Sequence, residues 1–242
     1  MTLAHAARSW VRSHVGVDVQ RYPQSDPLHG LSLLLRHLRV DLVIDVGAND
    51  GGYARTLRRL GYENRIVSFE PLSAPFARLS AAAQGDTRWE VVRSAVGDDE
   101  GEIVIHVAGN DGASSSALPM LDTHVAAAPT AAYVGEETVP LHRLDGLVGD
   151  RVQGRRCFLK LDVQGFEGAV LDGATDLLSQ GHVVGVQTEM SLVPLYEGSL
   201  LWRETVDRMS AAGYELASLV PGFTDPASGR LLQADGVFVR SS

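Results

Sequence analysis

The chain has 242 residues, enough for one sizeable α/β domain, and its composition of 45% hydrophobic and 21% charged residues is that of a globular protein. A net charge of −9 argues against a protein that binds nucleic acid by neutralising phosphates. The single cysteine, Cys157, excludes an internal disulfide, and no stretch approaches the roughly 20 apolar residues of a membrane span. Because residues 1–14 carry no signal-peptide pattern, we expect a cytoplasmic protein.

Helical and strand patterns alternate along the first hundred residues. The leucines of residues 29–39 recur at helical spacing, which predicts an amphipathic helix ahead of the core. The nearly continuous apolar run at 41–46 is typical of a parallel strand that is buried on both faces. The pattern then repeats as helix, strand, helix and strand, with predicted ranges 53–60, 65–69, 74–83 and 89–92.

The segment 100–145 has a different pattern. Residues 102–107 alternate between apolar and polar side chains, which predicts an antiparallel strand, and residues 137–144 are its expected partner. Between them, residues 108–135 are rich in Gly, Ala, Ser, Pro and Asp. We therefore expect a β-hairpin insertion with a long, partly ordered surface segment, a kind of loop that often carries function.

The rest of the chain returns to alternation. Strands are predicted at 157–163 and 183–189, helices at 167–178 and 200–212, and an antiparallel hairpin at 214–219 and 236–240. This order predicts an α/β fold with a mostly parallel sheet and helices on both of its faces. The predicted organisation is an N-terminal helical segment, 1–40, followed by one domain, 41–242, that includes the insertion.

The loop after the first strand is a candidate ligand-binding feature, because open α/β sheets bind ligands beyond the carboxyl ends of their strands. Gly47 and Gly51 allow tight turning and a close approach of the backbone to a ligand. A dinucleotide site would have its second glycine where Asn49 stands. Asp45 and Asp50 would repel a pyrophosphate, but they would attract an ammonium or sulfonium group.

Two further strand ends extend this candidate site. Glu70, followed by Pro71, ends the second strand roughly 20 residues beyond the glycine loop, where a carboxylate binds the ribose hydroxyls of a nucleoside. The small residues Ser94, Ala95 and Val96 follow the third strand and would let an adenine ring lie flat against the backbone. Together with the glycine loop, these residues predict a nucleoside-binding cleft.

Polar residues also follow the fourth and fifth strands. Asp162 is expected over the centre of the cleft, with Lys160 on the same side of the strand and Gln164 just beyond it. A purely structural ion pair between Lys160 and Asp162 is the alternative interpretation. Glu189 ends the fifth strand, and its carboxylate is also expected to point into the cleft.

Taken together and in this order, the motifs resemble those of the FkbM family of S-adenosylmethionine-dependent methyltransferases. The resemblance covers roughly residues 30–240 and rests on IDVGANDGGYA (44–54), IVSFEPL (66–72), SAVGDDEG (94–101), RLD (143–145) and FLKLDVQGFEGAVLDGA (158–174). It implies a Rossmann-like class I methyltransferase fold, whose seven-stranded sheet has an antiparallel last strand. It also implies O-methylation, commonly of sugars or glycosylated natural products.

The resemblance places S-adenosylmethionine across these strand ends. The glycine loop would hold its methionine part, Glu70 its ribose and residues 94–96 its adenine, while Asp162 would lie beside the methionine amine. The expected cofactor contacts are Asp45, Gly47, Ala48, Asn49, Gly51, Tyr53, Glu70, Pro71, Ser94, Ala95, Val96, Asp162 and Gln164.

Two mechanisms are open for activating the acceptor hydroxyl. Asp162, Glu189 or His142 would remove its proton as a general base. Alternatively, Asp162 and Glu189 would hold a divalent cation such as Mg²⁺, which would orient the hydroxyl and make it more acidic. The sequence does not choose between them.

The predicted function is O-methylation of a hydroxyl on a sugar, glycoside or glycosylated natural product. Residues 108–135 are the predicted acceptor wall or lid. A homodimer is one possible assembly. One alternative is an NAD-dependent oxidoreductase of the same architecture, which Asn49 disfavours. The other is a non-catalytic, cofactor-binding partner of another enzyme, which the cleft carboxylates disfavour.

Overall fold

The structure, a computed structural model, describes residues 10–16 and 28–241. The predicted N-terminal segment, 1–40, therefore lies partly outside the described residues. Within them, residues 10–15 are helical, and α2 (His29–His37) occupies the position of the first predicted helix. None of the helices in these two described ranges has the length and apolar character that crossing a bilayer requires.

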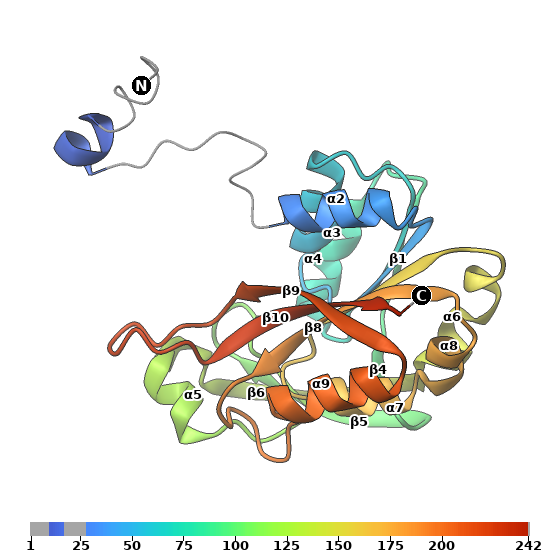
Figure 1. The fold of residues 1–242 in the computed structure, drawn as a ribbon. Helices are drawn as coiled ribbons and strands as arrows, with labels where there is room; N and C mark the ends of the chain where they lie inside the picture. The colour runs from blue at the N-terminus through green and yellow to red at the C-terminus, as the bar shows by residue number, and fades with distance from the viewer. Residues whose placement is uncertain (1–9, 17–27, 242) are drawn as a thin grey trace.

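Seven strands form one sheet, in which every strand except β10 points the same way (Figure 1). From edge to edge the order is β3 (Trp89–Val92), β2 (Arg65–Phe69), β1 (Leu42–Val46), β7 (Cys157–Leu161), β8 (Val183–Ser191), β10 (Gln233–Arg240) and β9 (Tyr214–Pro221). β10 lies between β8 and β9 and pairs antiparallel with both. This confirms the predicted sheet, and it places the last strand inside the sheet with β9 at the edge.

Helices cover both faces of the sheet (Figure 1). One face carries α2, α3 (Gly52–Arg59) and α4 (Ser73–Ala83), and the other carries α6 (Leu144–Val152), α7 (Glu167–Asp172), α8 (Thr175–Ser179) and α9 (Trp202–Ala211). Successive side chains of a strand point to opposite faces, so Val43 packs with the first group while Leu42 and Ile44 pack with the second. Each such fully buried side chain contributes about 1.5–3 kcal/mol, which explains why the central strands are continuously apolar.

A smaller sheet is built from the insertion. β5 (Gly101–Ala108) pairs antiparallel with β6 (Tyr133–Arg143), which in turn pairs parallel with β4 (Ala95–Gly97). The predicted hairpin is therefore present, and its connecting segment contains α5 (Asp122–Ala127) and a 3₁₀ turn (Pro129–Ala131) that the sequence patterns did not predict.

The predicted helix 167–178 is in fact two helices, α7 and α8, that are separated at Gly173. A Cβ atom at Gly173 would stand 1.8 Å from the carbonyl oxygen of Gly97, so the chain passes β4 at a distance only glycine allows. The carbonyl of Gly173 accepts a hydrogen bond from the N–H of Asp145 at 3.0 Å instead of continuing a helix. This contact with a distant segment interrupts the single helix that the apolar periodicity predicted.

α6 is a helix that the sequence patterns missed. Its glycines, Gly146 and Gly149, are poor helix formers and hide the pattern. Its buried residues Leu144, Val148 and Val152 nevertheless recur every fourth position, which is the signal that could have predicted it.

Candidate active site

The carboxyl ends of β1, β2, β3 and β7 surround a cavity with about 790 Å³ of free space, its open mouth included. Most of the sequence-predicted cofactor residues lie in its wall: Gly47, Asn49, Glu70, Pro71, Ser94, Ala95, Val96, Asp162 and Gln164. Leu72, Ile105 and Phe166 add apolar surface beside the small residues 94–96. The fold thus brings widely separated stretches of sequence to one pocket.

The glycine loop passes unusually close to β7. Gly47 has a φ of 77°, and a Cβ atom there would stand 1.9 Å from the carbonyl oxygen of Asp162. The N–H groups of Gly47 and Ala48 both donate to the carbonyl of Phe69, at 3.0 Å, which ties the loop to β2. Asn49 also adopts a left-handed φ of 47°, a conformation that asparagine tolerates better than most residues. The loop conformation therefore depends on the glycine at position 47 and is favoured by the asparagine at position 49.

Glu70 is fixed in the cavity wall by its neighbours' backbone. Its Oε2 accepts a hydrogen bond from the N–H of Asn49 at 2.8 Å, and its Oε1 accepts one from the N–H of Leu72 at 2.9 Å. Burial raises the pKa of Glu70 to about 7, although these two hydrogen bonds lower it. Each oxygen keeps a further lone pair, so the carboxylate can still accept from a ribose diol. These residues fit the nucleoside part of S-adenosylmethionine.

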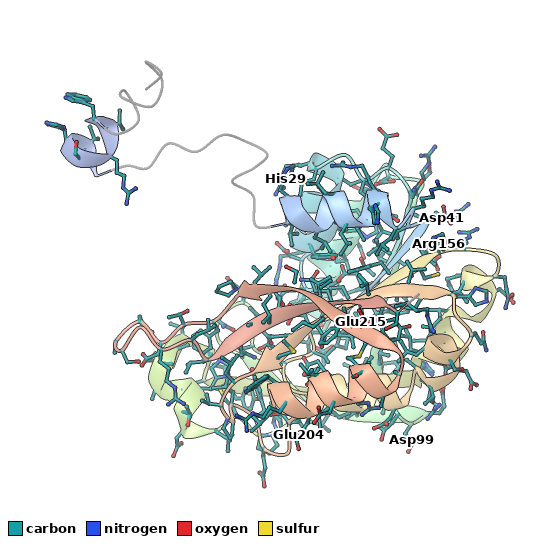
Figure 2. The ribbon with its side chains drawn as sticks, viewed as in Figure 1. His29, Asp41, Asp99, Arg156, Glu204 and Glu215 are labelled. Atoms are coloured by element: carbon teal, nitrogen blue, oxygen red, sulfur yellow. The ribbon has the colours of Figure 1, made fainter. Side chains whose placement is uncertain are left out.

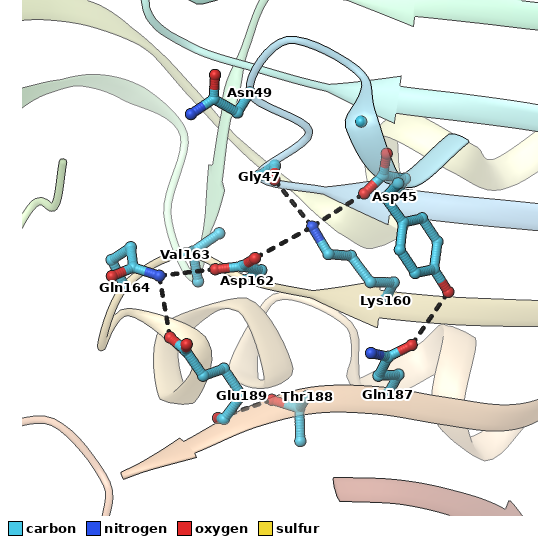
Figure 3. Close-up of polar contacts among 12 residues, drawn as sticks. Asp45, Gly47, Asn49, Lys160, Asp162, Val163, Gln164, Gln187, Thr188 and Glu189 are labelled. Atoms are coloured by element: carbon cyan, nitrogen blue, oxygen red, sulfur yellow. Dashed lines mark hydrogen bonds and ion pairs between the residues drawn. The ribbon is translucent and has the colours of Figure 1, made fainter. Parts of the chain in front are cut away.

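Lys160, the only lysine of the chain, holds the ends of β1 and β7 together (Figure 3). Its Nζ lies 3.1 Å from Asp45 Oδ1 and 3.6 Å from Asp162 Oδ2, and it donates to the carbonyl of Gly47 at 2.9 Å. Burial lowers the pKa of Lys160, but the two carboxylates outweigh that effect and raise it overall. Lys160 is therefore a fixed positive charge. Asp45 is fully buried beneath it and accepts from Ser68 Oγ at 3.0 Å, outside the cavity wall.

Gln164 joins the two carboxylates that the sequence placed at neighbouring strand ends (Figure 3). Its Nε2 donates to Asp162 Oδ1 at 2.8 Å and to Glu189 Oε2 at 3.0 Å, while its Oε1 accepts from the hydroxyl of Tyr196 at 2.8 Å. Burial, and then the charge of Asp162, raise the pKa of Glu189 well above its usual range. Nothing in the local sequence of Tyr196 indicates this distant partner, so its role could not be predicted from sequence patterns.

Comparison with known proteins assigns the chain to a family. A family model described as the methyltransferase FkbM domain matches residues 45–216, which is more than half of the chain and includes every residue of this network. The chain belongs to the FkbM methyltransferase family. The match rests on the sequence and agrees with the resemblance drawn from the motifs.

Two further similarities agree with this family. The chain is 26% identical over 185 residues to the 2-O-methyltransferase NoeI of Sinorhizobium fredii, a match that covers 74% of each protein. A crystal structure of a putative S-adenosylmethionine-dependent methyltransferase from Listeria monocytogenes superposes with a TM-score of 0.50 at 8% identity, covering 89% of this chain and 98% of that one. The second similarity shows the class I methyltransferase fold alone. Membership of the FkbM family decides against the alternative of an NAD-dependent oxidoreductase. The chain is therefore an S-adenosylmethionine-dependent methyltransferase.

The donor set of this FkbM site does not fit the divalent cation that the sequence suggested for Asp162 and Glu189. The described residues contain no group of three or more His, Cys, Asp or Glu side chains arranged to hold a metal ion. The Nε2 of Gln164, a hydrogen-bond donor, contacts both carboxylates where a bridging cation would have to stand. An amide nitrogen is not a metal ligand, so these residues do not fit a divalent cation.

His142, the third candidate general base, is not brought to the cleft. Its Nδ1 lies 2.6 Å from Glu100 Oε2, and in the small sheet the residue pairs with Val96 on β4. His142 is absent from the wall of the cavity that Val96 lines. Gly51 also lies outside that wall, since it packs against the ring of Trp89.

A second cavity, with about 880 Å³ of free space, lies on the α3 side of the glycine loop. It shares Gly47, Asn49 and Asp162 with the first cavity and adds Ala48, Asp50, Tyr53, Lys160, Gln187 and Asp235. The hydroxyl of Tyr53 donates to Gln187 Oε1 at 3.1 Å, and Lys160 Nζ lies 5.5 Å from the centre of the Tyr53 ring. Tyr53 was among the expected cofactor contacts, whereas no sequence pattern indicated Gln187 or Asp235 as site residues.

The insertion closes over the first cavity. Gly112, Ala113, Ser115, Ser116 and Ala117 contribute to its wall. Ser116 Oγ donates to the carbonyl of Gln164 at 2.6 Å, which attaches the segment to the loop that follows β7. This part of the predicted acceptor wall therefore faces the residues expected to hold the cofactor.

Proposed function

We propose that this protein transfers a methyl group from S-adenosylmethionine to a hydroxyl oxygen of a sugar, glycoside or glycosylated natural product. The position of Asp162 carries the proposal, because this carboxylate lines both cavities at the place where they meet. The relative from Sinorhizobium fredii, whose name describes a 2-O-methyltransferase, supports oxygen as the acceptor atom.

The first cavity offers a place for each part of the cofactor. Glu70 would hold the ribose hydroxyls, Ser94 to Val96 would lie against the adenine, and the loop at Gly47 and Asn49 would hold the methionine part. When bound, S-adenosylmethionine supplies a methyl group that is already activated by a positively charged sulfur. Positioning is therefore the main task of the protein, a contribution on the order of 7–11 kcal/mol in favourable cases.

Asp162 is the residue that we assign to receive the proton of the acceptor hydroxyl. Its Oδ2 faces Lys160 and its Oδ1 accepts from Gln164, so the carboxylate is oriented from two sides while its side chain stays 42% exposed. Glu189 does not line either cavity, and burial, then the charge of Asp162, raise its pKa well above the usual range, which disfavours its charged form. A general base placed in this way typically contributes about 10²–10⁴-fold in rate.

A methyl-transfer assay tests the proposal. Purified protein, S-adenosylmethionine with a labelled methyl group, and a panel of glycosides and sugar nucleotides should yield an O-methylated product and S-adenosylhomocysteine. EDTA should leave the rate unchanged, because the site offers no metal donor set. Methyl transfer only to nitrogen or carbon, or no turnover with the whole panel, would contradict the proposal, and the second result would revive a non-catalytic role.

A further inference from the structure

We propose that Tyr196 is a positioning residue: its hydroxyl holds the side-chain amide of Gln164 in the orientation that fixes the carboxylate of Asp162 where the two cavities meet. Tyr196 lines neither of these cavities, so it would act on the site only through Gln164. The role of Asp162 in the reaction rests on the proposed function. The inference adds how a buried side chain outside the cleft keeps that carboxylate in place.

The amide of Gln164 can stand in two orientations, and its neighbours decide between them. Nε2 carries two hydrogens, and the carboxylates of Asp162 and Glu189 accept one each, at 2.8 and 3.0 Å. In the reversed orientation Oε1 would face the same two acceptors and be repelled by them. The hydroxyl of Tyr196 donates to Oε1 at 2.8 Å, while the carbonyl of Ser114 stands farther from that hydroxyl, at 3.2 Å. The tyrosine therefore stabilises the observed orientation from the end of the amide that faces away from the carboxylates.

The turn that carries Gln164 is also shaped around the ring of Tyr196. Gln164 has a φ of 53°, a left-handed conformation that is strained for a residue with a side chain, and Gly165 follows with a φ of 95°. A Cβ atom at Gly165 would stand 2.9 Å from Cβ of Tyr196 and 3.0 Å from two of its ring carbons. The ring thus packs directly on the backbone of the turn, and Tyr196 holds Gln164 both by this contact and by its hydrogen bond.

Tyr196 is itself fixed by the insertion. The side chain is 1% exposed, and the ring of His124 on α5 packs edge-on against it, with the ring centres 5.1 Å apart. The backbone of Tyr196 forms an antiparallel bridge with Met120, and beside this bridge the N–H of Leu121 donates to the carbonyl of Leu195 at 2.9 Å. The insertion and the turn after β7 therefore meet at one side chain, whose position is set by both.

The N–H groups of the Gln164 amide give a direct readout, because both are hydrogen-bonded to carboxylates. Their NMR signals are identified by their loss in Gln164→Ala, and their hydrogen exchange should quicken at least tenfold in Tyr196→Phe. Tyr214→Phe is the matched control, since Tyr214 is also 1% exposed and its hydroxyl donates to a backbone carbonyl, that of Val183, at 3.0 Å. Exchange that is unchanged in Tyr196→Phe, or that quickens equally in both variants, would overturn the proposal.

Calorimetry with S-adenosylhomocysteine tests whether Tyr196 acts through Gln164. Asp162 is expected beside the methionine amine, so Tyr196→Phe should weaken binding about 3- to 10-fold, the range expected for one neutral hydrogen bond. Gln164→Ala should weaken it at least as much, and the double variant no further, because contacts that act in series do not add. Tyr214→Phe should bind normally.

Unchanged affinity in Tyr196→Phe, or losses that add in the double variant, would overturn the proposal, because Tyr196 would then act by another route or not at all. Neither measurement needs an acceptor. Failure of the methyl-transfer assay alone would therefore count only against the proposed function.

Discussion

Glu70 is the residue on which cofactor binding should depend most directly. It is 5% exposed, and each of its carboxylate oxygens already accepts one backbone N–H. A ligand hydroxyl that reaches it therefore meets a carboxylate whose orientation is set in advance, so little entropy is lost on binding. Charge-assisted hydrogen bonds of this kind are roughly twice as strong as neutral ones.

Replacing Glu70 by alanine should weaken binding of S-adenosylhomocysteine about 10- to 100-fold, because hydrogen bonds to a charged group contribute about 1.5–3 kcal/mol. Isothermal calorimetry measures the change, and circular dichroism should show an intact fold. Glu102→Ala, an exposed glutamate of β5, is the matched control and should bind normally. Normal affinity in Glu70→Ala would show that the ribose assignment is wrong.

The raised pKa of Glu70 predicts a pH dependence of binding. Burial raises it to about 7, so the apo protein gains a proton on Glu70 as the pH falls through neutrality. Ribose hydroxyls donate to the charged carboxylate, and the protonated form should therefore bind more weakly. Affinity for S-adenosylhomocysteine should fall below about pH 7 with a limiting slope near tenfold per pH unit, and Glu70→Gln should remove this slope in calorimetric titrations.

At the scale of elements, the glycine loop and β7 form one unit. The N–H of Asp162 donates to the carbonyl of Val46 at 3.1 Å, and Gly47 passes the carbonyl of Asp162 with no room for a side chain. The position of the candidate base is thus coupled to the conformation of the loop that should hold the methionine part.

Gly47→Ala should test this coupling. The added Cβ would stand 1.9 Å from a backbone oxygen, so the loop must move, and binding of S-adenosylhomocysteine should fall more than 100-fold. Gly85→Ala is the matched control, because Gly85 has a similar positive φ of 84° but no atom within 4 Å of the added Cβ. Backbone strain should cost both variants about 1–3 kcal/mol in urea unfolding, and Gly47→Ala should lose more because its Cβ also clashes, but only Gly47→Ala should lose binding. Equal binding losses would contradict the coupling.

At the scale of the whole molecule, the strand ends gather buried carboxyl groups. Burial is the main cause that raises the pKa of Glu70 and Glu167 to about 7 and that of Asp235 to about 6. A parallel sheet directs several strands toward one edge, so acidic residues that are far apart in sequence share the same small volume. These buried carboxyl groups therefore destabilise the folded protein when they are charged.

The unfolding free energy of the apo protein should therefore decrease as the pH rises from about 4.5 to about 7. A carboxyl group whose pKa is raised in the folded state stabilises the fold when protonated, and this contribution is lost as the pH passes through the raised pKa. Urea unfolding between pH 5 and pH 8 measures it, and Glu167→Gln should flatten the dependence. Stability that rises steadily to pH 8 in the parent protein would contradict the assignment.

The sequence by itself determined the main sheet, the glycine loop and most of the residues that line the first cavity. These features depend on local rules, since the burial of β1 on both faces, the turn at Gly47 and the strand end at Glu70 each leave a mark within a few neighbouring residues. The FkbM motifs carry the same local information over residues 45–216.

Only the tertiary structure decided which polar residues act together. Tyr196 reaches Gln164, and Asp235 joins the cavity beside Tyr53, through strand register and chain crossings that no local pattern encodes. The same long-range packing removed His142 from the cleft and broke the helix at Gly173. The physical reason is that a contact between distant segments depends on the whole arrangement of the sheet, whereas a strand or a turn is set by its own few residues.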